Sequence, residues 1–107
     1  MSERPRYRVH TEVGRGFIVV TVQRWVIYLE DKGFWQTELD PGPGLNIRNR
    51  CEWEVRPPGW LARRFGDTFA KRTKRARAQA RQWIANADAA WDRAENALAD
   101  SEDGEGA

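Results

Sequence analysis

The chain has 107 residues, a net charge of +2 and a 40% share of hydrophobic residues. This length allows a single domain with a core of modest size. The longest apolar run, Phe17 to Val20, is too short to cross a bilayer. Cys51 is the one cysteine, which excludes an internal disulfide, and no hydrophobic leader is visible, so we expect a reducing compartment, the cytoplasm.

The first half of the chain predicts an antiparallel sheet of three to four strands. Residues 7–13 alternate apolar and polar side chains, and residues 17–29 are rich in β-branched and aromatic residues, as one long bent strand or two short ones. Gly14 to Gly16 is a turn, and Asp31 to Gly33 is a hairpin turn in which Gly33 is free to adopt a positive φ. The later strands are expected at residues 34–39 and 51–55.

The second half predicts one long helix. Residues 40–44 form a Pro- and Gly-rich loop, and a short helical turn at residues 60–65 ends at Gly66. Asp67 or Thr68 caps the next helix, which has no Gly or Pro before residue 98 and is longer than the sheet. The sequence therefore predicts one α+β domain over residues 1–100. Its parts are a sheet at 6–56, a helix at 60–99 and a disordered acidic tail at 101–107.

One face of the predicted helix is apolar along its whole length. Its first half should pack on the sheet through Phe69, Ala76, Ala80, Trp83 and Ile84. Its second half has no sheet left to cover, so a partner is expected to cover the apolar stripe, either a second copy in a parallel or antiparallel helix pair or another protein. The alternatives are that the helix bends back or that Trp91 covers a sheet edge. The predicted protein-interface residues are Ala87, Trp91, Ala94 and Leu98.

Charge is distributed unevenly along the helical half. Residues 63–81 contain eight basic residues and one acid, for a charge of +7, whereas residues 88–107 contain seven acids and one arginine, for a charge of −6. The basic run suggests an anionic partner, with nucleic acid as the first candidate. Two alternatives are that the acidic end of another copy neutralises it and that it is a solvated helix face without a partner. The expected nucleic-acid-binding residues are Arg63, Arg64, Lys71, Arg72, Lys74, Arg75, Arg77 and Arg81.

Two other surfaces are alternative sites for an anionic partner. The sheet offers four arginines to nucleic acid, namely Arg6, Arg8, Arg15 and Arg24. The apolar residues Trp60, Leu61 and Phe65 beside two arginines have the composition of an interfacial membrane segment. The segment is short, however, and burial in the core explains these residues more simply, so a membrane is not the expected partner.

No residues form a catalytic or metal-binding constellation. His10 is the single histidine and lies in a predicted strand. Cys51 has only Arg48 and Arg50 beside it, which could lower its pKa modestly, and a structural strand cysteine is the favoured interpretation. We therefore predict a binding module with no catalytic residue, no cofactor and no metal.

The order of elements resembles a family of short phage proteins. The sheet is followed by the segment 67–71 (Asp-Thr-Phe-Ala-Lys), spaced alanines at Ala76 and Ala80, and residues 82–84 (Gln-Trp-Ile). This pattern resembles actinobacteriophage proteins of β-β-β-α type, and it is similar to the sheet-plus-helix domains of phage integrases whose sheet enters the DNA major groove. The resemblance covers residues 7–85. It implies a phage accessory protein in a bacterial host, with a host protein as candidate partner.

Overall fold

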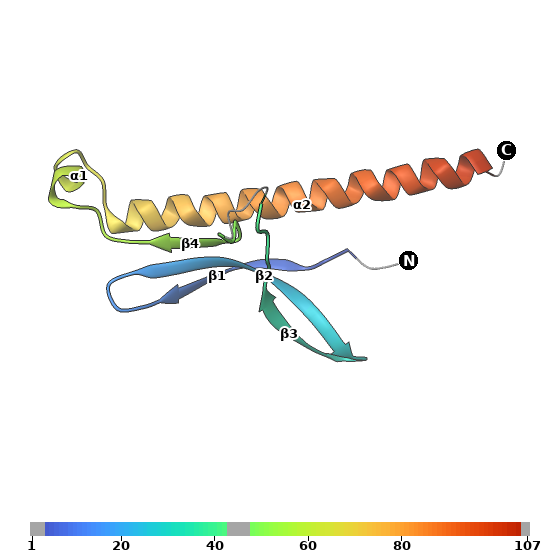
Figure 1. The fold of residues 1–107 in the computed structure, drawn as a ribbon, viewed down its shortest axis with the longest axis horizontal. Coiled ribbons are helices and arrows are strands. Elements are labelled where there is room, and N and C mark those ends of the chain that lie inside the picture. The colour runs from blue at the N-terminus through green and yellow to red at the C-terminus, as the bar shows by residue number, and fades with distance from the viewer. Residues whose placement is uncertain (1–3, 43–47, 106–107) are drawn as a thin grey trace.

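The computed structural model describes residues 4–42 and 48–105 and shows an antiparallel sheet beside one long helix (Figure 1). The predicted α+β fold class is confirmed, and the division into domain and tail stays a prediction. The long helix continues beyond its predicted end at residue 99. The elements are β1 (Tyr7–Val13), β2 (Ile18–Leu29), β3 (Lys32–Thr37), β4 (Glu52–Val55), α1 (Trp60–Arg64) and α2 (Phe69–Glu105).

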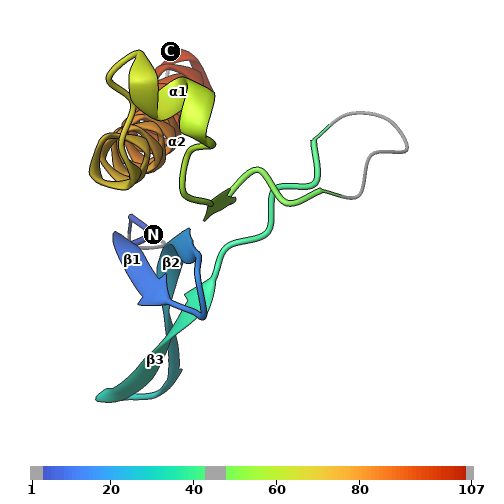
Figure 2. The same ribbon diagram turned by 90° about the vertical axis from the view of Figure 1, so that its left-hand side faces the viewer.

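Strand β2 is the central strand, and its two halves have different neighbours. The first half pairs with β1 on one side, where Val13 lies opposite Ile18, and with β4 on the other, where Val55 lies opposite the same residue. The second half pairs with β3, from Gln23 opposite Thr37 onward. A three-stranded body therefore continues into a two-stranded ribbon that extends away from α2 (Figure 2).

The turn of this ribbon differs from the predicted one. It lies at Glu30 and Asp31, so Gly33 falls inside β3 and does not have a positive φ. Gly33 instead provides space, because a Cβ there would lie 2.6 Å from the indole of Trp25 on the neighbouring strand. The glycine at this position is therefore explained by close packing under a tryptophan and not by a positive φ.

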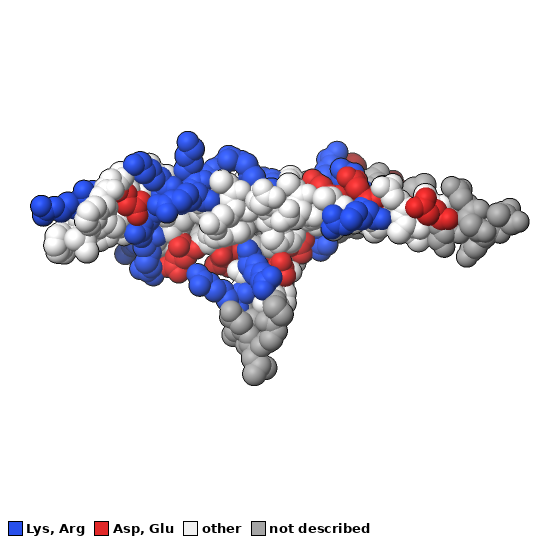
Figure 3. All heavy atoms as spheres, turned by 90° about the horizontal axis from the view of Figure 1, so that it is seen from above, with Lys and Arg blue, Asp and Glu red and all other residues white. Residues whose placement is uncertain are grey.

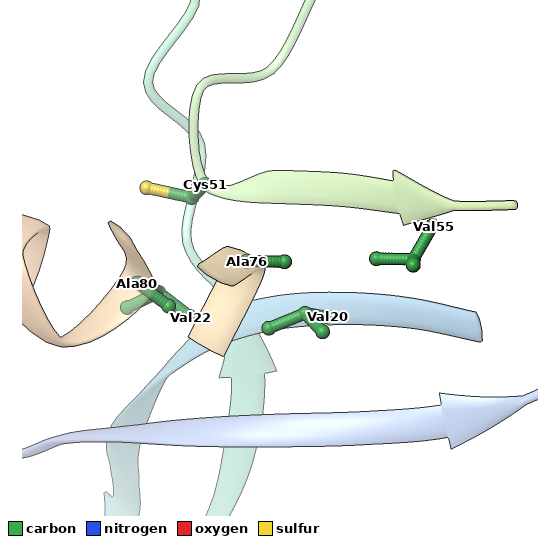
Figure 4. Close-up of a cluster of buried hydrophobic side chains, with 6 residues drawn as sticks. All are labelled: Val20, Val22, Cys51, Val55, Ala76 and Ala80. Atoms are coloured by element: carbon green, nitrogen blue, oxygen red, sulfur yellow. The ribbon is translucent and has the colours of Figure 1, made fainter. Parts of the chain in front are cut away.

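The core lies between the three-stranded body and the first half of α2. Ala76 and Ala80 face the sheet, and their small side chains let the helix approach the strands closely (Figure 4). Phe69, Trp83 and Ile84 flank them, as the periodicity predicts. The buried residues are Val20, Val22, Cys51, Val55, Ala76 and Ala80.

Polar contacts fix the start of α2 and the segment that precedes β4. The hydroxyl of Thr68 accepts a hydrogen bond from the backbone N–H of Lys71 at 3.1 Å, so Thr68 is the N-cap. Gly66 ends α1 with a φ of 89°, as the sequence predicts. Asn49 accepts hydrogen bonds from the N–H groups of Asp40 and Cys51 at 2.9 and 3.0 Å, which holds residue 40 beside the start of β4.

The molecule is elongated because several elements extend from the core. Its radius of gyration is 18.5 Å and its longest dimension is 66 Å. A compact chain of this length would have a radius of gyration of about 13 Å. The second half of α2 runs past the sheet, α1 lies at the opposite end, and the β2–β3 ribbon extends to a third side (Figures 1 and 2). These three extensions therefore expose surface that a partner could contact.

The aromatic residues of the α1 segment are exposed. Trp60 is 75% exposed and Phe65 is 82% exposed, and Leu61 also faces solvent. Burial of these three residues in the core, as the sequence analysis expected, is wrong. Helix α1 has only five residues and lies beyond the end of the sheet, so it has no apolar surface to cover.

Candidate functional site

The candidate site is the basic surface formed by α1 and the first half of α2. Figure 3 shows Lys and Arg side chains gathered over this end of the molecule, whereas Asp and Glu are mixed with them further along α2. The structure brings the eight sequence-predicted basic residues together, although they surround the helix on more than one side. Their contacts divide them into a neutralised group and a group without an acidic partner.

Asp67 neutralises two of these arginines. Its carboxylate accepts hydrogen bonds from Arg72 at 2.8 Å and from Arg75 at 2.9 Å. The hydrogen bond from Arg72 is the main reason that the pKa of Asp67 lies below its usual range. Arg72 and Arg75 are therefore held at the start of α2, and their charge is shared with one acid.

Six basic residues of this surface have no acidic partner within the part of the chain that the structure describes. The ammonium group of Lys71 donates to the carbonyl oxygen of Gly66 at 2.7 Å, and Arg77 donates to the hydroxyl of Thr11. A groove of about 560 Å³ runs along one side of α2. Its lining residues are Ile18, Phe69, Ala70, Thr73, Lys74, Arg77 and Arg81. Three cations and an apolar floor thus line an open groove.

The arginines of the sheet do not form a comparable surface. Arg8 lies beside Gln23 and Arg24 beside Tyr7, so the two arginines point to opposite faces. The guanidinium of Arg8 stacks on Trp35 with 4.4 Å to the ring centroid, and Arg24 pairs with Glu38 at 3.4 Å. The strand pattern alone could not reveal this, because the faces depend on the register.

The four predicted protein-interface residues have different surroundings. Ala87 and Trp91 are half-buried, whereas Ala94 and Leu98 are exposed, with Leu98 at 65%. The indole N–H of Trp91 is shielded from solvent and has no hydrogen-bond acceptor among the described residues. The N-terminal segment reaches this region, since Arg4 pairs with Asp92. Only the far end of the stripe is an open apolar surface.

Sequence reasoning missed the apolar tip of the β2–β3 ribbon. Four large apolar residues there are exposed, including Ile27 at 58%, because neither β1 nor α2 reaches this part of β2. The sequence did contain one indication of this tip. The strand predicted at residues 17–29 is far longer than its neighbour at residues 7–13, so part of it had to extend past that neighbour. The exposed tip residues are Ile27, Tyr28, Leu29 and Phe34.

Cys51 and His10, the other side chains with possible reactivity, have structural positions in or beside the sheet. Burial raises the pKa of the Cys51 thiol to about 12, so the modest lowering expected from Arg48 and Arg50 is wrong. His10 is a half-buried residue of β1. Across the described residues, no group of three or more His, Cys, Asp or Glu side chains is arranged to hold a metal ion.

Comparison with known proteins gives no relative from which a function could be inferred. No protein-family model matches the chain, and no curated protein or solved structure matches it. The resemblance to phage accessory proteins therefore stays an expectation. Within residues 4–42 and 48–105, no helix is both long and apolar enough to cross a membrane.

Proposed function

We propose that the protein is a non-enzymatic binding module that contacts the phosphate backbone of nucleic acid through the basic surface of α1 and α2. The observation that carries this proposal is the group of six basic residues without an acidic partner in the described chain. Such a surface supplies the electrostatic, sequence-independent part of nucleic-acid affinity.

The surface has the properties that backbone contact requires. Lysine and arginine side chains on adjacent helical turns can each reach a separate phosphate, and their mutual repulsion falls when an anion binds. Arg63 and Arg64 in the last turn of α1 extend the surface beyond the start of α2. Nothing in this arrangement reads base edges, so the proposed binding has little sequence preference.

The test measures affinity for duplex and single-stranded DNA and RNA by fluorescence anisotropy over a range of salt concentrations. The key variant is Arg63→Gln/Arg64→Gln/Lys71→Gln. A control variant, which has one change fewer, removes two cations elsewhere, as Lys32→Gln/Arg93→Gln. Each lost phosphate contact lowers the slope of log affinity against log salt by about 0.9 on duplex DNA. For the key variant the slope of log affinity against log salt should therefore be smaller in magnitude by about 2 to 3 than for wild type. For the control the slope should be almost unchanged. Undetectable binding of wild-type protein at low salt contradicts the proposal.

A second candidate function is docking onto another protein. The observation that favours it is the exposure of large apolar side chains at two separate places, α1 and the ribbon tip. Exposed clusters of this kind are typical of protein-binding surfaces. Replacing Trp60 and Phe65 with serine should abolish capture of a host protein if α1 is the docking surface. Capture that survives these changes, and also survives Ile27→Ser/Phe34→Ser, excludes both surfaces.

A further inference from the structure

One side of α2 carries charges in a symmetric order. Three cations are followed by three anions, at spacings of three, four, seven, four and three residues. Residues at these intervals lie on the same side of a helix. Each cation is as far from the midpoint between Ile84 and Ala85 as one of the anions. We name these residues the charge ladder, and its matching pairs are Lys74 with Glu95, Arg77 with Asp92, and Arg81 with Asp88.

The charge ladder is not neutralised within one chain. α2 is a single extended helix, so Lys74 and Glu95 lie about 32 Å apart along its axis at 1.5 Å per residue (Figure 1). In the described chain, Asp92 pairs with Arg4, and the other five ladder residues have no ion pair. The described chain therefore supplies no ion-pair partner to Lys74, Arg77 or Arg81.

The order of the charges also opposes the helix macrodipole. Acidic residues are favourable near a helix N-terminus and basic residues near its C-terminus. In α2 the first turn contains no acid and the last turn contains no base. This arrangement does not help an isolated helix, but it does suit a pair of helices that run in opposite directions.

We propose that the charge ladder binds the ladder of a second copy of this chain, with the two α2 helices antiparallel. The cations of each copy then face the anions of the other, and the midpoint of the ladder lies on a two-fold axis, as an isologous interface requires. Every pair occurs twice, which makes six intermolecular ion pairs between helices about 8–10 Å apart. This inference does not rest on the proposed nucleic-acid function, although three cations are common to both.

The fold leaves room for this arrangement. The groove of about 560 Å³ lies beside Lys74, Arg77 and Arg81, where the partner's anions would lie. The sheet packs only under the first half of α2, so the second half of the partner's helix brings no sheet into that groove (Figure 1). The two sheets would lie under opposite ends of the helix pair. Short side chains at Ala78 and Ala85 allow the helices to approach.

The charge pattern favours the ladder over the predicted apolar stripe as the contact between copies. Antiparallel pairing through Trp91 and Leu98 would place Asp88, Asp92 and Glu95 of both copies beside one another. Like charges in this position repel. Pairing through the ladder places the same acids against cations, so a second copy is the occupant that the charges specify.

The test measures the mass of the full-length protein by multi-angle light scattering after nuclease treatment. Variant one reverses the cations, as Lys74→Glu/Arg77→Glu/Arg81→Glu. Variant two reverses the anions, as Asp88→Lys/Asp92→Lys/Glu95→Lys, and variant three combines all six changes. We expect a wild-type dimer at about 0.05 M salt that dissociates toward 1 M, where the screening length falls to about 3 Å.

The reversal series has a specific expected pattern. Variants one and two should each associate at least about tenfold more weakly than wild type, which corresponds to about 1.4 kcal/mol. Variant three should dimerise again, and an equimolar mixture of variants one and two should form a heterodimer. A matched control, Arg63→Glu/Lys71→Glu/Arg75→Glu, makes the same charge change outside the ladder and should remain dimeric.

Other results would overturn the proposal. A wild-type monomer at every salt concentration, a dimer that survives in variant one, or a variant three that is folded by circular dichroism but monomeric each contradicts it. A dimer that nuclease treatment removes indicates bridging by nucleic acid instead. The outcome is separable from the proposed function, because the matched control keeps the ladder and loses nucleic-acid contacts.

Discussion

The two halves of α2 have similar alanine-rich sequences but very different surroundings. The first half buries Ala76 and Ala80 against the sheet, whereas the second half extends past the sheet and pairs with the N-terminal segment through Asp92 and Arg4. Packing of an apolar face stabilises the first half. The second half depends on helix propensity and on whatever partner it meets. One continuous helix therefore serves as core in one part and as exposed surface in the other.

Electrostatics separates the two halves in the same place. Like charges at intervals of three and four residues destabilise a helix by a few tenths of a kcal/mol per pair. The first half contains such pairs among cations, as at Lys74 and Arg77, and the second half contains them among acids, as at Asp88 and Asp92. Binding of a polyanion would reduce the repulsion among the cations only. An antiparallel second copy would reduce the repulsion among both the cations and the acids. The ladder therefore accounts for the charges of both halves, whereas the basic run accounts for those of one.

The largest expected difference between the halves is their tolerance of added volume. Ala80 is completely buried against β2, so Ala80→Leu should lower the free energy of unfolding by about 1–3 kcal/mol through overpacking. Ala97→Leu adds the same atoms to an exposed site and should change the free energy of unfolding by less than about 0.5 kcal/mol. Urea denaturation of the two variants measures both values. Equal destabilisation would show that the second half is packed in solution.

A smaller difference is expected from weakening the helix itself. Gln79 and Ala97 lie on the same side of α2, five turns apart, and both are exposed. Gln79→Gly should cost roughly 0.5–1 kcal/mol of global stability, since the first half unfolds together with the core. Ala97→Gly should leave global stability nearly unchanged and should instead speed amide exchange in the second half, which can open locally. Hydrogen exchange measured by mass spectrometry resolves the two cases.

The sequence was sufficient to predict the elements that local patterns determine. The alternation in β1, the helical seam from Phe69 to Ile84 and the helix end at Gly66 each depend on residues close together in the chain. The placement of β4 on the other side of β2 from β1 could not be predicted, because it depends on pairing across a long connection. The exposure of Trp60 and Phe65 was missed for a related reason, since burial depends on where the sheet ends.

The candidate site was predictable only as a set of charges. The basic run from Arg63 to Arg81 is visible in the sequence, but its division is not, because Asp67 accepts from two arginines only after the chain turns at Gly66. The symmetric spacing of the charge ladder was also visible. Its meaning required the structure, which shows that the sheet lies under the first half of α2 and that the second half runs past it.

The last difference concerns pH and the core beneath the first half of α2. Burial raises the pKa of the Cys51 thiol from 9.0 to about 12, so the folded state favours the neutral thiol. This contribution to stability is fully present below pH 9 and is lost as the pH rises through 12, because the unfolded chain releases the proton first. Wild-type stability should therefore fall more steeply over this range than that of Cys51→Ala, measured by urea denaturation at each pH. In the same folded protein Cys51 should resist thiol reagents at neutral pH, whereas a cysteine placed in the second half by Ala97→Cys should react at once. Rapid labelling of Cys51 would mean that the first half opens as readily as the second, and the contrast between the two halves of α2 would then not hold.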